Sequence, residues 1–195
     1  MIIRYLIFSR IVLAAYILLF FIHNCLALSS FYIFKDYKAN VNHFLSVVRN
    51  GDLDNINYKI ENKDKDNSFI KISYRPTDWD KYGWSSISWM ISNNEEESYN
   101  MLEAKRVVFL ARGDTGGEIV QFEIGSISEI QDKVTSTSTG ALILTNNWQE
   151  YSIDLEGVDL SSLKVAFSLI INKIDNLNGA DIYLDEIRYE FWNSE

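Results

Sequence analysis

The chain has 195 residues, enough for one domain with a substantial hydrophobic core, and it carries 18 basic against 27 acidic residues. The formal net charge of −9 argues against DNA or RNA as a partner, because phosphate binding needs a basic surface. With one cysteine and two histidines, the chain offers almost no candidates for a zinc site, a cysteine nucleophile or a Ser-His-Asp triad.

The first 28 residues differ in composition from the rest. Arg4 and Arg10 precede an unbroken run of twelve apolar residues, Ile11 to Ile22, and small residues follow from Ala27. This order is typical of a secretory signal peptide, and an uncleaved N-terminal membrane anchor is the alternative. We therefore expect an exported protein, secreted or held at the cell surface. Residues 1–28 hold two of the basic residues, none of the acidic ones and the only cysteine, so the remainder has a net charge of −11 and no disulfide.

After this segment, the sequence predicts a β protein. Residues 29–55 are expected to form an N-terminal extension and a first strand, although the stretch from Phe44 to Val48 fits a short helix equally well. Residues 56–192 alternate short apolar-polar stretches with turn signals, which is typical of a β-sandwich or jelly roll. Strands are expected at 56–60, 70–74, 84–91, 106–112, 118–124, 141–145, 150–155, 164–172 and 181–190, with a polar loop at 126–139.

The stretch from Val107 to Gly125 is expected to be a β-hairpin. Val107, Phe109 and Ala111 alternate with the residues between them before a glycine-rich turn at 113–117, and Val120, Phe122 and Ile124 do so after it, as expected of strands with one buried face. Arg112 precedes this turn and Glu118 follows it. We expect the two side chains to meet across the hairpin mouth, in a pair that fixes the strand register.

Three motifs give the chain a resemblance to a known superfamily. They are Ala-Arg-Gly-x-x-Gly-Gly-Glu from Ala111, Leu-Thr-x-x-Trp-x-x-Tyr-x-Ile-Asp-Leu from Leu144, and Ile-Tyr-Leu-Asp-Glu-Ile-Arg-Tyr-Glu ending at Glu190. Together they resemble non-catalytic carbohydrate-binding modules of the galactose-binding-like jelly-roll superfamily, which also includes the complex I intermediate-associated proteins. The resemblance spans about residues 69–190. It implies an all-β jelly-roll β-sandwich that binds a polysaccharide or glycan. We expect a monomer that contacts a membrane only through its N-terminal segment, if that segment is uncleaved.

An aromatic and polar cluster at 74–84 is the predicted ligand site. Sugars stack their C–H faces on Trp and Tyr rings, while their hydroxyls need polar partners. Trp79 and Tyr82 stand among charged residues and are expected to contact a ligand or form an exposed rim. Trp89 is expected in the core, whereas Trp84, on the opposite face of the same strand, fits either the core or the site. The predicted ligand-binding residues are Tyr74, Arg75, Asp78, Trp79, Asp80, Tyr82 and Trp84.

The resemblance also implies a structural calcium ion. In related modules an aspartate of the last strand helps to hold calcium together with oxygens from the N-terminal strand, and Asp185 stands at that position. Calcium takes six to eight oxygen ligands, so Asp185 needs partners, for which Asp52 and Asp54 are candidates. Glu186 stands where the family often has a second aspartate. The alternative is an aspartate that only bonds backbone amides at a strand end.

Two other functions compete with glycan binding. A structural or adhesion protein of the cell envelope would bind other proteins through the sandwich and would expose aromatic residues without polar neighbours. An enzyme that hydrolyses glycosides would need two carboxylates facing each other across a groove, about 5–10 Å apart. Glu95 to Glu97 are adjacent in one loop and are expected to be solvated. We therefore predict a protein that is not an enzyme.

Overall fold

The computed structural model describes residues 28–36, 43–44, 46–62, 67–91, 98–125 and 135–192. The predicted signal segment, apart from the backbone of Leu28, and the acidic residues Glu95 to Glu97 lie outside this part of the chain. No helix within it is long and apolar enough to cross a membrane. Residues 30–191 form one compact unit. The elements are β1 (Leu28–Phe34), β2 (Ser46–Gly51), the 3-10 helix η1 (Leu53–Asn55), β3 (Ile56–Asn62), β4 (Ser68–Tyr74), β5 (Trp84–Met90), β6 (Ala104–Gly113), β7 (Ile119–Gly125), β8 (Ser136–Ile143), β9 (Gln149–Asp154), β10 (Val165–Asn172) and β11 (Ala180–Trp192).

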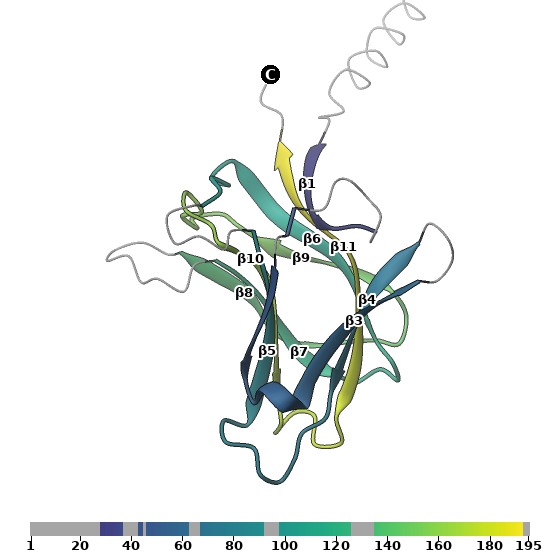
Figure 1. Cartoon of the computed structure of the whole chain (residues 1–195). Coiled ribbons are helices and arrows are strands. Elements are labelled where there is room, and N and C mark those ends of the chain that lie inside the picture. Colours follow the sequence, from purple (N-terminus) through teal and green to yellow (C-terminus); the bar gives the residue numbers. More distant parts are fainter. Residues whose placement is uncertain are drawn as a thin grey trace, which may run out of the picture. The chain divides into compact units, whose positions relative to one another are not determined.

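The strands form two antiparallel sheets that face each other as a β-sandwich (Figure 1). The first sheet has the order β3-β4-β11-β6-β9, and β1 pairs with β11 beside this path. The second sheet has the order β2-β5-β10-β7-β8. Most neighbours within a sheet are distant in sequence, which is typical of a jelly roll. The predicted all-β jelly-roll sandwich is confirmed.

The core lies between the sheets because alternate side chains of each strand point inward. Its centre is a group of three phenylalanines from both sheets, Phe109, Phe122 and Phe167, whose ring centroids lie 4.5 to 5.5 Å apart. The ring of Trp89 on β5 lies 5.8 Å from Phe167 and is 1 % exposed. The predicted core position of Trp89 is therefore confirmed, and the face of β5 that carries Trp84 points away from the core.

Two stretches that the sequence left open or assigned to a loop are strands. The stretch around Val47 belongs to β2, which pairs with β5 from Ser46 opposite Met90 onward. Both β1 and β2 thus belong to the sheets although they precede residue 56. β8 begins at Ser136, inside the expected loop 126–139. Its polar residues join the sheet because hydroxyls can support strand pairing, as where the Thr139 hydroxyl accepts a 3.0 Å hydrogen bond from the backbone of β7.

The predicted hairpin of β6 and β7 is wrong. β6 pairs with β11 and β9 in the first sheet, whereas β7 pairs with β10 and β8 in the second. Both hydrogen-bonding edges of each strand are therefore occupied, and the link between them crosses from one sheet to the other. Gly116 and Gly117 have φ angles of 84° and 97° in this link, which a residue with a side chain rarely adopts. Alternation identified the strands correctly but does not specify their partners.

The predicted pair of Arg112 and Glu118 is also wrong. Glu118 is buried, and its carboxylate accepts hydrogen bonds from the backbone N–H and the hydroxyl of Thr115, at 2.8 and 3.1 Å. The guanidinium of Arg112 instead lies 3.7 Å from the ring centre of Tyr183 and 5.5 Å from that of Trp148. The two side chains separate because Glu118 satisfies backbone groups of the link and Arg112 packs on aromatic faces.

Candidate functional site

A cleft of about 560 Å³ lies on the outer face of the second sheet. We call it the sheet groove. Its floor consists of outward-facing side chains from the middle strands, mostly small and polar. The described residues that line it are Asn50, Trp84, Ser86, Ser88, Glu123, Ile124, Gly125, Thr135, Ser136, Val165, Ser168 and Ile170.

Strand register places these side chains in rows across the sheet. Ser88 on β5 pairs with Ser168 on β10. Ser168 pairs in turn with Glu123 on β7. In the adjacent row, Asn50 on β2 pairs with Ser86 on β5. Paired residues point to the same face of a sheet, so the serines form a low floor between larger side chains.

The groove presents polar groups that can bind a ligand. The hydroxyls of Ser88 and Ser168 bond to each other at 2.8 Å. The side chains of Asn50, Ser86 and Glu123 have no hydrogen bond or ion pair with another described residue. An amide, a hydroxyl and a carboxylate are therefore available as donors and acceptors along the groove.

Two aromatic rings lie at the groove end where β5 begins. Trp84 lines the groove, and its ring centroid lies 6.3 Å from that of Tyr82, at an interplanar angle of 54°. Tyr82 is 54 % exposed, and the ammonium of Lys81 lies 4.7 Å from its ring centre. Both rings offer apolar faces at the edge of a polar floor, which is the combination that sugar recognition requires.

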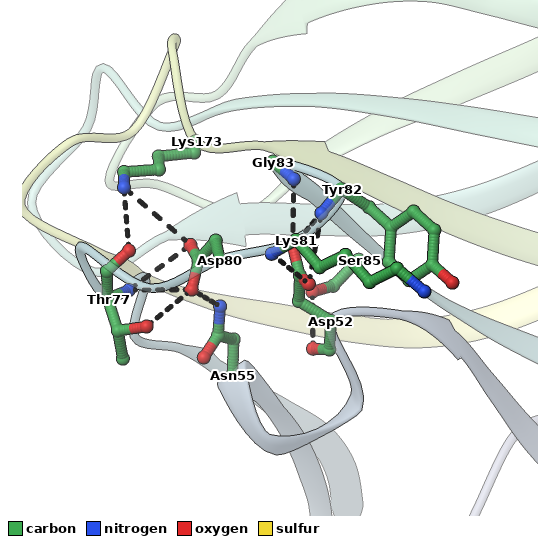
Figure 2. Close-up of polar contacts among 9 residues, drawn as sticks. All are labelled: Asp52, Asn55, Thr77, Asp80, Lys81, Tyr82, Gly83, Ser85 and Lys173. Carbon is green, nitrogen blue, oxygen red and sulfur yellow. Dashed lines mark hydrogen bonds and ion pairs between the residues drawn. The ribbon is translucent and has the colours of Figure 1, made fainter.

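Figure 2 shows how the segment before Trp84 is held. The carboxylate of Asp52, directly after β2, accepts hydrogen bonds from the backbone N–H groups of Lys81, Tyr82 and Gly83, at 2.9, 3.2 and 2.8 Å. A single carboxylate thus satisfies three successive backbone donors. The position of the two aromatic rings depends on this contact, which joins the ends of β2 and β5.

The carboxylate of Asp80 also holds the segment before Trp84, through a second set of contacts (Figure 2). It accepts hydrogen bonds from the side chains of Thr77 and Asn55, both at 2.6 Å, and lies 4.0 Å from the Lys173 ammonium. Burial alone would raise the pKa of Asp80, but the bonds from Thr77 and Asn55 and the charge of Lys173 outweigh it, so the pKa lies below its ordinary value. The side chain of Asp80 is only 2 % exposed, so it braces the loop and is not available to a sugar.

The other predicted ligand residues divide between fold and surface. Tyr74 is fully buried, and burial together with nearby acidic groups raises its pKa to about 12, so its ring belongs to the core and cannot contact a surface ligand. Arg75 bonds the carboxylate of Asp181 at 2.9 Å and the carbonyls of two residues, and so joins β4 to β11. Asp78 is exposed, and Trp79 is 92 % exposed at the tip of the loop.

The sequence prediction therefore placed one edge of the groove and missed its floor. Trp84 is the one predicted ligand residue among the described residues that line the groove, and Tyr82 lies beside it. The missed residues include Ser86, Ser88 and Glu123. Their signal was the alternation itself, because they occupy the positions between inward-facing apolar residues of β5 and β7.

Asp185, the predicted calcium ligand, lies on β11 at a bulge where Glu186 has a φ of 49°. The pKa of Asp185 is raised to about 7, chiefly by burial. A 2.7 Å hydrogen bond from the Glu186 N–H lowers the pKa, whereas the negative charges of Glu186 and Asp36 raise it further. Asp36 follows β1, so the N-terminal strand does bring an acidic residue near Asp185. Asp52, by contrast, is engaged with the 81–83 segment. Within the described residues, no group of three or more His, Cys, Asp or Glu could hold a metal ion.

Comparison with known proteins identifies the fold. Neither the protein-family models nor the curated proteins compared with the sequence match it. A crystal structure of a family 30 carbohydrate-binding module superposes with a TM-score of 0.59 and 13% identity, over 87% of this chain and 91% of that chain. The family 11 module of the cellulosomal cellulase Lic26A-Cel5E of Clostridium thermocellum gives a TM-score of 0.57 and 13% identity, over 87% and 98%.

A third structure is a family 11 module from Clostridium thermocellum in complex with a β-1,3-1,4-mixed-linked tetrasaccharide. It superposes with a TM-score of 0.53 and 12% identity, over 82% of this chain and 94% of that chain. At these identities the likeness concerns the fold. The chain has the jelly-roll β-sandwich fold of carbohydrate-binding modules, as its motifs predicted.

Proposed function

We propose that this protein binds carbohydrate without catalysing a reaction, and that the sheet groove is the binding site. The observation that carries the proposal is the groove itself, which combines free polar groups with the ring of Trp84. The fold, shared with carbohydrate-binding modules, supports the same function. The ligand is a polysaccharide or glycan, because an open groove along a sheet accepts a chain of sugars more readily than a small compact molecule.

In the proposed mechanism, Trp84 and Tyr82 stack on sugar faces at one end of the groove. Asn50, Ser86 and Glu123 bond sugar hydroxyls along the floor, and these bonds replace bonds to water. Affinity is expected to be modest, because a shallow wet site exchanges bonds to water for bonds to the ligand and gains little for each. Trp79 and Asp78 extend from the adjacent loop and can add contacts to a long chain.

We propose that the protein acts outside the cell, either secreted or attached to the cell surface. This location rests on the predicted signal segment within residues 1–28. Polysaccharides are available there to an exported module. We also propose that Asp185 and Asp36 help to hold a structural calcium ion. The charge of Asp36 acts on Asp185, and the two carboxylates are hard oxygen donors of the kind that calcium takes; further oxygens must complete its six to eight ligands.

Isothermal titration of the purified protein with β-glucan oligosaccharides, including the mixed-linked tetrasaccharide bound by the family 11 module, tests the proposal. Trp84→Ala is expected to abolish measurable binding, while Trp79→Ala, at a side chain that is 92 % exposed, reduces it by less. Circular dichroism and thermal melts of each variant establish that the fold is intact. Binding that survives in Trp84→Ala would place the site elsewhere, and no binding to a broad glycan array would refute the proposed function.

One observation favours a second candidate, an envelope protein that binds other proteins. Ile174 and Leu177, in the link between β10 and β11, are 81 and 69 % exposed, and Lys173 in the same link bonds the carbonyl of Thr77 at 2.6 Å. Exposed apolar residues of this link and Trp79 thus occur in neighbouring loops, where a protein partner could cover them. The glycan experiment separates the two candidates, because a protein-binding surface requires no sugar and no groove.

A further inference from the structure

We infer that Glu123 makes the sheet groove selective for charge, so that it prefers amine-bearing oligosaccharides over N-acetylated ones and rejects those with carboxylates. The inference rests on the proposed function, because it concerns the same groove. The inference adds a ligand class, glycans of 2-amino-2-deoxy sugars, and names the residue that determines this preference.

The setting of Glu123 distinguishes it from the other acidic residues that the structure describes. It is the one charged residue among the described residues that line the groove. On the groove floor it pairs with Ser168 on one side and Ser138 on the other, and neither serine can neutralise it. No described side chain bonds or pairs with its carboxylate. With respect to the described part of the chain, the carboxylate is therefore left to bind a cationic or hydrogen-bond-donating group of a ligand.

The distance between Glu123 and the aromatic end sets the size of the ligand. Trp84 pairs with Asn172 on β10. Four residues along β10, Ser168 pairs with Glu123. With about 3.3 Å per residue along a strand and about 4.8 Å between strands, the two side chains start roughly 16 Å apart. One sugar cannot contact both, so a ligand that stacks on Trp84 and reaches Glu123 must be an oligosaccharide.

Charge then decides which oligosaccharide gains from reaching Glu123. An ammonium group beside the carboxylate adds an ion pair and a charge-assisted hydrogen bond, whereas an acetamido group adds at most a neutral bond. A uronic acid brings a second negative charge and is repelled. For a partly exposed pair the gain is modest, roughly fivefold in affinity, and it decreases with salt.

Three β-1,4-linked oligosaccharides of equal length test the inference, because they share a backbone and differ in substituents: glucosamine, N-acetylglucosamine and glucose oligomers. A C6-oxidised cello-oligosaccharide supplies the anionic member. Affinities are measured by isothermal titration with the whole protein, with Glu123→Gln, and with Glu156→Gln as a matched control. Glu156 is exposed beyond β9, so this control removes the same charge from the chain without altering the groove.

The wild type and Glu156→Gln are expected to bind the glucosamine oligomer roughly fivefold more tightly than the N-acetylglucosamine and glucose oligomers. Both proteins should bind the oxidised oligomer most weakly. Glu123→Gln should lose this preference, so that its affinities for the glucosamine and glucose oligomers become similar. A preference that persists in Glu123→Gln, or no preference in the wild type, overturns the inference and leaves glycan binding standing. Failure of all four ligands to bind overturns the inference, and the proposed function falls with it only if the broad glycan array also shows no binding.

Discussion

Asp52→Ala removes the carboxylate that accepts backbone hydrogen bonds from residues 81, 82 and 83. Bonds to a charged acceptor contribute about 1.5–3 kcal/mol each when buried, but Asp52 is partly exposed and water replaces part of the loss. We therefore expect the free energy of unfolding to fall by about 2–3 kcal/mol in total. The free energy of unfolding should fall by less in Asp52→Asn, because this variant keeps an acceptor oxygen and loses only the charge.

Two measurements test this expectation. Urea unfolding followed by tryptophan fluorescence gives the loss of stability, and hydrogen exchange of the amides of residues 81–83 reports directly on the three donors. Asp54→Ala is the control, since this neighbouring aspartate is exposed on η1 and its side chain has no hydrogen bond or ion pair with another described residue. The reasoning is refuted if Asp52→Ala is as stable as Asp54→Ala, or if those amides exchange no faster than in the wild type.

Three further predictions concern other parts of the fold. Calcium should raise the melting temperature of the wild type by several degrees and leave Asp185→Asn unchanged; equal responses would contradict calcium binding there. The pKa of Asp80 is lowered in the folded protein from its ordinary 3.8, so its contribution to stability is present above pH 3.8 and is lost as the pH falls through the folded pKa. As the pH falls, the free energy of unfolding should therefore decrease less steeply in Asp80→Asn than in the wild type. Parallel plots of unfolding free energy against pH for the two proteins would contradict this. Gly113→Ala would place a Cβ 1.8 Å from the Glu118 carboxylate and should lower the free energy of unfolding by about 1–3 kcal/mol. A double variant with Glu118→Ala should recover much of this loss. Additive effects of the two substitutions in urea unfolding would rule out this clash.

Much of the fold could be predicted because strand alternation is a local property. The inward positions of β5 and β7 follow from the spacing of apolar residues, which is why Trp89 was placed correctly in the core. Strand partners depend on the whole chain and could not be predicted in this way. The stretch from Val107 to Gly125 has the local pattern of a hairpin, yet its two strands belong to different sheets.

The candidate site was harder to predict, because a side chain's chemistry does not reveal its partners. Asp80 and Arg75 have the polar groups expected of a sugar-binding residue, but other loops and strands already engage them. Ser86 and Ser88 show no functional pattern in the sequence. They acquire a role only because the sheet places Ser88 in the row of Glu123 and Ser86 in the adjacent row. The sequence prediction grouped residues that are near each other in the chain, whereas the described lining of the groove comes from five strands.

The most direct test of the central claim fills the groove instead of removing a contact. Ser86 lines the floor and has no bonding partner among the described side chains, so Ser86→Trp should block the groove with little effect on the core. Affinity electrophoresis in gels containing soluble polysaccharides then compares this variant with the wild type. The account predicts that at least one polysaccharide retards the wild type and that Ser86→Trp, folded by circular dichroism, migrates freely. Equal retardation of both proteins, or retardation of neither, would contradict it.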